Sequence, residues 1–272
     1  MLICPVCQSP LQVSAKIFRC TLNHSFDIAK EGYVNLHIVQ HKKSKNPGDT
    51  PQAVQARREF LSAGHYAPFR TAVADIVHKL QAGVVMDIGC GEGYYTQALT
   101  AQTQVLGLDI AKSAVQIAAK ADKNKRVCWL VGTSSALPVA SGSVNVCTSL
   151  FSPLPKQEIY RVLDVSGVLL VAVAAPRHLY AVREALFGTV IEHSPDKYLD
   201  VLAPEFVLTD RQQITVPMQL DNQSLRQLIA MTPYAYKATA ERRAWLERQE
   251  SFEAVGEFCV MLFKKTVMVE YY

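Results

Sequence analysis

The stretch GVVMDIGCGEG at residues 83–93 restricts the fold of this 272-residue chain more than any other part of the sequence. An apolar run ends in Asp87, glycines follow at 89, 91 and 93, and the residues YYTQAL then begin a helical pattern. This order predicts a strand, a tight loop and a helix. Glycines let such a loop turn sharply and approach a ligand closely, and the start of the helix offers free N–H groups to a polar ligand.

The segments after the loop predict alternating strands and helices. Residues 104–109, 126–132, 144–150 and 167–174 form short apolar runs, and KSAVQIAAKA after the first of them has a helical pattern. Such alternation favours a parallel, doubly wound α/β sheet. A ligand is then expected across the carboxyl ends of the strands. Asp109, which ends the second strand, could accept hydrogen bonds from both hydroxyls of a ribose.

The spacing of the glycines decides between two nucleotide-type ligands. A dinucleotide-binding loop prefers G-x-G-x-x-G, whereas this chain has G-x-G-x-G after an acid at the strand end. The variant resembles the first motif of class I methyltransferases, which bind S-adenosylmethionine (SAM). The expected fold is therefore the class I SAM-dependent methyltransferase fold, a Rossmann-like doubly wound sheet. A glycine loop used only for packing would leave Asp87 and Asp109 unexplained.

A second cluster lies at the start of the sequence. Two cysteines form a C-x2-C pair, and twelve residues later a C-x3-H pair follows, which gives the set Cys4, Cys7, Cys20 and His24. Zinc favours a Cys3His set, and closed four-ligand sites are structural. So short a segment cannot build its own core, so the metal would supply its folding energy. The alternative, buried free thiols beside a chance histidine, does not explain why the other four cysteines are scattered.

The positive charge is concentrated at the front of the chain. Residues 1–70 hold nine Lys or Arg and four Asp or Glu, which gives this segment a net charge of +5. The whole chain has a net charge of +4, so the remainder carries −1. This distribution suits a polyanionic partner, although a solvated basic loop gives the same count. Groups that could grip phosphates are HKKSKN (41–46), Lys30, Arg57, Arg58 and Arg177. Tyr33 and Tyr66 could stack on bases or simply pack.

The sequence also indicates the cellular compartment. No apolar run reaches the roughly 18 residues of a membrane helix, and the segment MLICPVCQ lacks the pattern of a secretory signal. Seven unevenly spread cysteines do not form a disulfide framework. We expect a cytoplasmic protein.

Several longer segments together resemble one family, the bacterial 23S ribosomal RNA guanine-N1 methyltransferases with an N-terminal zinc module. The segments are FDIAKEGYVNL (26–36), PGD (47–49), QARREFLSAGHY (55–66), DIGCGEGYYT (87–96), PRHL (176–179) and MTPYAYKA (231–238). The resemblance implies methyl transfer from SAM to N1 of a guanine in a 23S rRNA hairpin loop near the peptide exit tunnel. Loop bases are unstacked and can be flipped into a cleft. It also implies that the zinc module grips the RNA and that the protein forms a homodimer. HKKSKNPGD favours the Gram-negative branch over the macrolide-resistance branch.

The resemblance also assigns residues to the cofactor. The expected SAM-binding set is Tyr66, Asp87, Gly89, Gly91, Glu92, Gly93, Asp109 and His178, with TSSALPV (133–139) as the adenine-contacting loop. In this set Asp87 would orient the amino group directly or through water. Tyr66 could instead be a core aromatic, and His178 a residue at a helix N-terminus.

The catalytic base stays unidentified at this point. Many amino-directed methyltransferases hold Asn or Asp before Pro-Pro where this chain has FSPLP (151–155). Ser152 and Glu31 are the two candidates. Asn145 stands where many relatives have Asp, and a structural role at the start of a strand is the better interpretation for it.

We expect three parts in the chain: a zinc-binding RNA-recognition module at 1–36, a basic loop with linking helices at 37–82, and the methyltransferase domain with a C-terminal elaboration at 83–272. Two other functions remain open. A methyltransferase of a small molecule or protein could use the zinc module for docking, and a non-enzymatic RNA-binding protein could keep a vestigial fold. The basic front segment favours RNA over the first, and the intact acid–glycine loop argues against the second.

Overall fold

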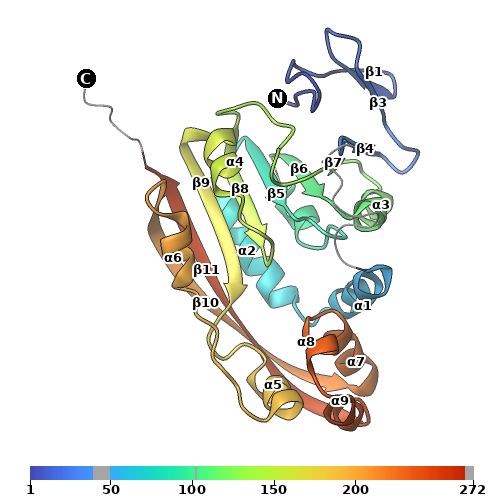
Figure 1. Ribbon diagram of the computed structural model, residues 1–272, viewed down its shortest axis with the longest axis vertical. Coiled ribbons are helices and arrows are strands. Elements are labelled where there is room, and N and C mark those ends of the chain that lie inside the picture. The colour runs from blue at the N-terminus through green and yellow to red at the C-terminus, as the bar shows by residue number, and fades with distance from the viewer. Residues whose placement is uncertain (39–49, 102, 267–272) are drawn as a thin grey trace.

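The structure is a computed structural model that describes residues 1–38, 50–101 and 103–266. Figure 1 shows a small N-terminal part next to a larger part built around one long twisted sheet. The predicted basic stretch HKKSKN and the PGD motif lie outside the described residues. Among the helices of the described ranges, none has the length and apolar character needed to cross a bilayer.

The central sheet has eight strands in the order β10-β11-β9-β8-β5-β6-β7-β4 across the described residues. The pairs from β4 to β9 are parallel, and β11 and β10 join antiparallel at the other edge. The strands are β4 Tyr33–Asn35, β5 Val84–Ile88, β6 Gln104–Asp109, β7 Val127–Val131, β8 Val144–Leu150, β9 Leu163–Ala174, β10 Phe206–Asp221 and β11 Ser251–Lys265. The predicted doubly wound α/β fold is confirmed.

The segment after the glycine loop differs from its prediction. Residues Thr96–Leu99 form a single 3-10 turn, η2, so the helix predicted there is wrong. The chain is diverted because Tyr94 and Tyr95 pack edge to face, with ring centroids 5.1 Å apart, and Tyr95 packs in the same way on Phe69. The side chain of Thr96 turns inward to the end of β5 and is fully buried.

Helices cover both faces of the sheet and so build two hydrophobic cores (Figure 1). On one face lie α2 (Ala67–Lys79) and α3 (Lys112–Ala121), and on the other α4 (Lys156–Val162) and α6 (Lys197–Leu202). The remaining helices gather beside the far ends of β10 and β11. They are α1 Pro51–Ser62, α5 Tyr180–Phe187, α7 Asn222–Ala230, α8 Tyr234–Lys237 and α9 Ala240–Leu246.

The start of α1 illustrates how the sequence fixes an element near the ligand side of the sheet. Thr50 has extended backbone geometry, and its hydroxyl accepts a hydrogen bond from the Ala53 N–H at 3.2 Å. Pro51 occupies the first helical position, where a missing N–H costs nothing. Gln227 Nε2 on α7 then donates to Glu59 at 2.8 Å, which ties α1 to the C-terminal helices.

The N-terminal segment forms a second, three-stranded antiparallel sheet from β1 (Gln12–Ser14), β2 (Ile17–Arg19) and β3 (Ser25–Asp27). The chain then enters the central sheet, because β4 pairs in parallel with β7. Its first residues dock on the loop between β7 and β8: Ile3 N–H donates to the Pro138 carbonyl at 3.0 Å, and Ala140 N–H donates to the Met1 carbonyl at 2.8 Å.

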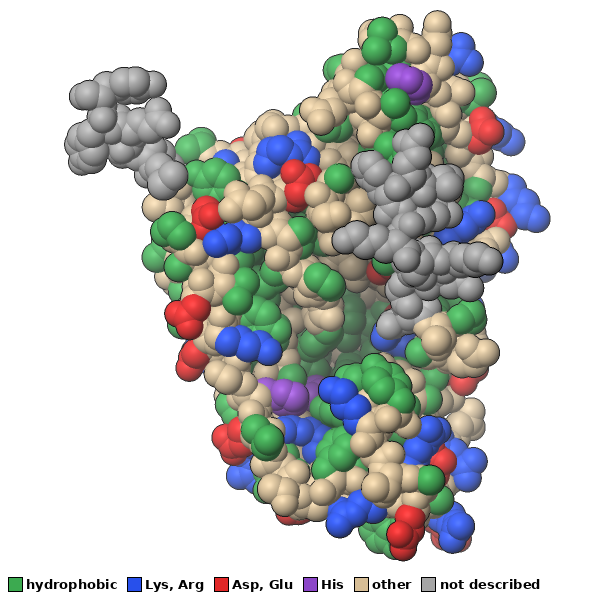
Figure 2. Space-filling model, viewed as in Figure 1, with side chains coloured by type: hydrophobic (Ala, Val, Ile, Leu, Met, Phe, Trp, Pro, Cys, Tyr) green, Lys and Arg blue, Asp and Glu red, His purple; other side chains and the backbone are tan. Residues whose placement is uncertain are grey.

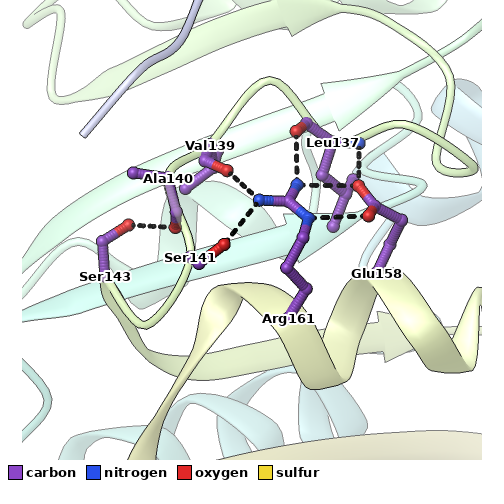
Figure 3. A network of polar contacts seen from close by, with 7 residues as sticks. All are labelled: Leu137, Val139, Ala140, Ser141, Ser143, Glu158 and Arg161. Carbon is purple, nitrogen blue, oxygen red and sulfur yellow. Dashed lines mark hydrogen bonds and ion pairs between the residues drawn. The ribbon is translucent and has the colours of Figure 1, made fainter. Parts of the chain in front are cut away.

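One arginine on α4 holds this docking loop in place (Figure 3). Arg161 forms a bidentate pair with Glu158, with N···O distances of 2.7 and 2.8 Å. Its Nη atoms also donate to the carbonyls of Val139 and Leu137 at 2.8 and 2.9 Å. Glu158 in turn accepts the Leu137 N–H at 2.6 Å. The pair thereby fixes the surface on which the N-terminal segment rests.

Candidate functional site: a cofactor pocket and a metal cluster

The first candidate site is the cysteine–histidine cluster. The structure brings together one ligand atom from each of Cys4, Cys7, Cys20 and His24, all within 4.8 Å of one another. The Sγ atoms of Cys7 and Cys20 are 3.6 Å apart, and His24 Nδ1 is 3.4 Å from Cys20 Sγ. A tetrahedral zinc with bonds of about 2.3 Å to sulfur places its ligands ~3.8 Å apart. The cluster therefore fits a structural zinc ion.

The second candidate site is a pocket of about 470 Å³ at the carboxyl ends of the parallel strands. This volume is within the range of about 300–1,000 Å³ common for small-ligand sites. On the face drawn in Figure 2 the molecule is hollowed between its upper and lower parts, and hydrophobic side chains line the floor. Five residues of the predicted cofactor set line the pocket: Asp87, Gly89, Gly91, Glu92 and Asp109.

Asp109 shapes the glycine loop through its own hydrogen bonds. Its Oδ2 accepts the Gly91 N–H at 3.0 Å, and its Oδ1 accepts the Ala111 N–H at 2.7 Å. The N–H groups of Gly89 and Cys90 donate to the Leu108 carbonyl at 2.8 and 3.0 Å. These N–H groups of the glycine loop thus fasten the loop to β6.

Gly91 marks the place where a ligand can come closest to the backbone. Its φ of +55° lies in the left-handed region, and no atom lies within 4 Å of where its Cβ would be. At Gly89, in contrast, a Cβ would meet the Ser152 side chain at 2.4 Å. Gly93 is not among the described residues that line the pocket, and it packs on Trp129 and Ala118.

Asp87 lines the pocket but is already held by two hydroxyl groups. Thr96 Oγ1 donates to its Oδ2 at 2.6 Å, and Thr148 Oγ1 donates to its Oδ1 at 2.7 Å. Burial raises the pKa of Asp87 to about 6, and the two hydroxyl hydrogen bonds oppose the rise. Its carboxyl group can therefore gain or lose a proton near neutral pH, and a cationic ligand would favour the charged form.

Tyr66 and His178, the two outer members of the predicted set, are not among the described residues that line the pocket. The ring centroids of both lie 4.9 Å from that of Phe258 on β11, so the structure brings them together there. Phe258 is in turn 5.7 Å from Phe151, which does line the pocket. Both residues therefore lie one aromatic ring behind the pocket wall, and their role in SAM binding stays a prediction.

The polar atoms of these two side chains differ. The hydroxyl of Tyr66 is buried without a hydrogen-bond partner in the described part of the chain, and burial raises its pKa. In His178 the Nδ1–H must donate to the Glu257 carbonyl, at 2.8 Å, because a carbonyl can only accept. Burial lowers the pKa of His178 to about 4, so the ring is neutral at physiological pH.

The two candidates for a catalytic base have different positions. Ser152 lines the pocket, but its hydroxyl bonds to the Ile88 carbonyl at 2.5 Å and to Ser149 Oγ at 2.8 Å. Glu31 lines a different cavity and accepts a hydrogen bond from Gln116 on α3 at 3.0 Å. Asn145 is structural: its Oδ1 accepts the Val84 N–H at 2.8 Å, which fixes the start of β5.

Residues that the cofactor prediction did not include also line the pocket, among them Arg57, Tyr95, Ala111 and Phe151. No shared sequence pattern marks these four residues as a cofactor set, because they come from α1, from the turn after the glycine loop, and from the segments that follow β6 and β8. Thr133 and Ser134, from the predicted adenine loop, do line the pocket. Phe151 is 47% exposed and has a φ of +57°, a strained backbone conformation for a residue with a side chain.

Comparisons with known proteins also separate the segment with the metal cluster from the segment with the cofactor pocket. A zinc-ribbon family model described as RlmA, N-terminal, matches residues 2–45, and a model described as methyltransferase domain matches residues 85–167. The first range contains the metal cluster, and the second contains the acid–glycine loop.

Full-length relatives decide the family. The chain is 32% identical over 241 residues to the 23S rRNA (guanine(748)-N(1))-methyltransferase of Streptomyces fradiae, with 86% of this chain and 85% of that protein covered. The chain belongs to the 23S rRNA (guanine-N1)-methyltransferase family. A Bacillus subtilis protein with a provisional name of the same class is 26% identical, with 97% of each chain covered.

Solved structures support the fold of this family member. The YcgJ protein of Bacillus subtilis superposes with a TM-score of 0.52 at 18% identity, covering 73% of this chain and 99% of that one. The protein is thus a SAM-dependent methyltransferase with a zinc ribbon. Its pocket lies at the carboxyl ends of the parallel strands, the place where doubly wound folds commonly bind ligands.

Proposed function

We propose that this protein transfers the methyl group of SAM to N1 of a guanine in a hairpin loop of 23S rRNA. The observation that carries the proposal is the match over most of the chain to a relative with that named activity, together with a pocket lined by the acid–glycine loop. SAM supplies an electrophilic methyl group on a good leaving group, so the chain has to bind, orient and desolvate the reactants.

The charges of the pocket suit a cationic cofactor. Three carboxylates line it, from Asp87, Glu92 and Asp109, and among the described lining residues Arg57 carries the one positive charge. SAM carries a positive sulfonium and a positive amino group against one carboxylate, whereas the product left after transfer lacks the sulfonium charge. A negative pocket therefore holds the cofactor more tightly than the product. We propose that Gly91 and Glu92 lie at the methionine and ribose end.

The guanine would enter beside Phe151. This ring is half-exposed at the edge of the pocket, and its backbone is held in a left-handed conformation between Leu150 and Ser152. An exposed aromatic face at a cofactor pocket can stack on an unpaired base, which contributes about 1–3 kcal/mol per base. Phe151 thus supplies a platform that a flipped loop guanine can use.

Guanine N1 carries a proton at neutral pH and has to lose it. The hydroxyl of Ser152 is engaged with the Ile88 carbonyl, and Glu31 faces another cavity, so neither is placed as the base. Arg57 is the lining cation, and its Nη2 donates to the Met231 carbonyl at 3.5 Å. We propose that Arg57 polarises guanine O6, which makes the N1 proton more acidic.

The test uses the full chain, labelled SAM and a transcript of the 23S rRNA hairpin. N1 methylation blocks Watson–Crick pairing, so primer extension should stop one nucleotide before a loop guanine. A transcript with that guanine replaced by adenine is the control and should take up no label. The variant Phe151→Ala should raise KM for the RNA about tenfold or more and change the Kd for SAM much less. Absence of label from every RNA tested would rule out the proposed function.

The same experiment tests the finer expectations. The position of the stop distinguishes the Gram-negative branch, favoured by the sequence, from the branch of the Streptomyces fradiae relative, whose name gives guanine 748. A homodimer is part of the proposal, and sedimentation measures it. The protein would act in the cytoplasm, where ribosomal RNA is modified. We also propose that the chain has three parts, at 1–36, 37–82 and 83–272.

A further inference from the structure

A second cavity, of about 440 Å³, lies where the zinc-binding segment meets the central sheet. One wall comes from the β1–β2 turn and the β3–β4 turn, with Lys16 and Lys30. The opposite wall comes from the end of α3 and the start of β7, with Lys125. All three lysines are exposed. We call the surface formed by Lys16, Lys30, Lys120 and Lys125 the basic groove.

Two acidic groups that line the cavity, Glu31 and Asp122, offset only part of its charge, because four lysines against two carboxylates leave a net charge of +2. Asp122 is buried, and its carboxylate accepts the N–H groups of Arg126 and Val127 and the Trp129 indole N–H at 2.9–3.2 Å. Glu31 accepts a hydrogen bond from Gln116 at 3.0 Å. That hydrogen bond lowers the pKa of Glu31, and the charges of Lys30 and Lys120 lower it to a smaller extent.

The two walls are held rigidly relative to one another. The parallel pairing of β4 with β7 runs from Tyr33 opposite Trp129 to Asn35 opposite Val131, directly behind the cavity. Asp122 fixes the turn that carries Lys125. Figure 2 shows Lys and Arg side chains along the right flank of the upper part, over this region. A fixed set of cations is suited to an extended polyanion, because little ordering is needed on binding.

The position of the basic groove relative to the pocket limits what it can bind. Trp129 lines the groove, and Thr133, four residues later along the same strand and loop, lines the cofactor pocket. An extended chain rises ~3.3 Å per residue, so these two lining residues are up to ~13 Å apart. The groove is therefore a site separate from the pocket, placed to contact a flanking part of an RNA whose target nucleotide lies in the pocket.

We infer that the basic groove binds the phosphate backbone of the RNA stem next to the target loop, so that the zinc segment and the α3–β7 turn grip the substrate jointly. The inference rests on the proposed function, since the polyanion is taken to be the RNA substrate. It assigns a role in substrate binding to Lys120 and Lys125, which lie in the methyltransferase part of the chain. Contacts of this kind carry no sequence information.

The test compares two double variants with the same change in net charge. Lys30→Ala with Lys125→Ala removes two charges of the groove. Lys79→Ala with Lys264→Ala removes two exposed charges elsewhere, on α2 and on β11 near the opposite edge of the sheet. RNA affinity is measured by titration at several salt concentrations, with the hairpin transcript as the probe. Each lost phosphate contact should lower the slope of log K against log salt by about 0.7–0.9.

We expect the groove variant to lose about 1.5 units of slope and at least about tenfold in affinity, while the control variant keeps the wild-type slope. The Kd for SAM should stay the same in both. Equal slopes for the two variants, with a wild-type protein that still methylates the transcript, would overturn the groove inference and leave the proposed function intact. A wild-type protein that binds but never methylates RNA would instead refute the proposed function.

Discussion

At the scale of single residues, the environment of Asp87 makes stability depend on pH. Burial raises its pKa from the ordinary value of 3.8 to about 6. Below the lower value the carboxyl group is protonated in both the folded and the unfolded chain. Between about 4 and 6 the unfolded chain ionises first, so raising the pH favours unfolding. The contribution to the free energy of unfolding lost over this window is about 3 kcal/mol.

The variant Asp87→Asn cannot ionise and should lack this dependence. We therefore expect the free energy of unfolding of the wild type, relative to the variant, to fall by up to about 3 kcal/mol between pH 4 and pH 7. Urea unfolding followed by circular dichroism at each pH measures it. Asp75→Asn, at an exposed position on α2, is the control and should follow the wild type. Parallel curves for wild type and Asp87→Asn would contradict the prediction.

Bound SAM should offset part of the stability that the folded protein loses when Asp87 ionises. Its positive charges favour the ionised carboxyl group, so we expect SAM to bind the wild type more tightly as the pH rises through about 6, and to bind Asp87→Asn with little change.

The residue types at the site were readable from the sequence, but their contacts were not. Asp87 was recognised because it follows an apolar run just before the glycine loop, and Asp109 because it ends the next strand. That Thr148 would bind Asp87 follows only from the pairing of β5 with β8, 61 residues apart along the chain. The exposure of Phe151 likewise depends on packing at the pocket edge, which no local pattern shows.

At the scale of elements, the parallel strands were the predictable part of the fold. β5 to β8 are buried on both faces and read as continuous apolar runs, so their positions are close to those predicted. β10 was missed because most of its residues are exposed and polar, as in TDRQQ, and it lies at the sheet edge. β11 is one long strand between β10 and β9.

The α4 pair Arg161 and Glu158 gives a prediction at this scale. Arg161→Met removes the hydrogen bonds to Val139 and Leu137, so the docking loop should loosen and the protein should lose about 2 kcal/mol of stability. Amide hydrogen exchange should speed up at 137–140 and also at 1–4, which hydrogen-bonds to this loop. Arg211→Met is the control, because its ion pair with Asp196 is exposed and should contribute less than about 1 kcal/mol. Unchanged exchange at 1–4 would show that the pair does not hold the N-terminal segment.

At the scale of the whole molecule, the zinc-binding segment and the catalytic core share one sheet. β4 is the edge strand beside β7, and Leu2, Val34 and Leu36 are buried in the same core as α4. The metal cluster itself lies before β4, in a segment whose own strands are three residues long and mostly exposed. The apolar contacts of the core can therefore persist when the metal-held turns are lost.

Removing the metal should accordingly separate the two binding functions. Cys4→Ser with Cys7→Ser should release zinc and disorder β1 to β3, because strands of this size cannot remain folded alone. One wall of the basic groove would be lost, so RNA affinity should fall by more than about tenfold. The Kd for SAM should change little, since the described lining of the pocket begins at Val54. Zinc content, RNA titration and SAM calorimetry measure the three quantities, with Cys259→Ser, which lies outside the cluster and lines neither cavity, as the control. An equal loss of RNA and SAM binding would mean that the metal holds the entire fold together, and that the core contacts of β4 are too weak to persist without it.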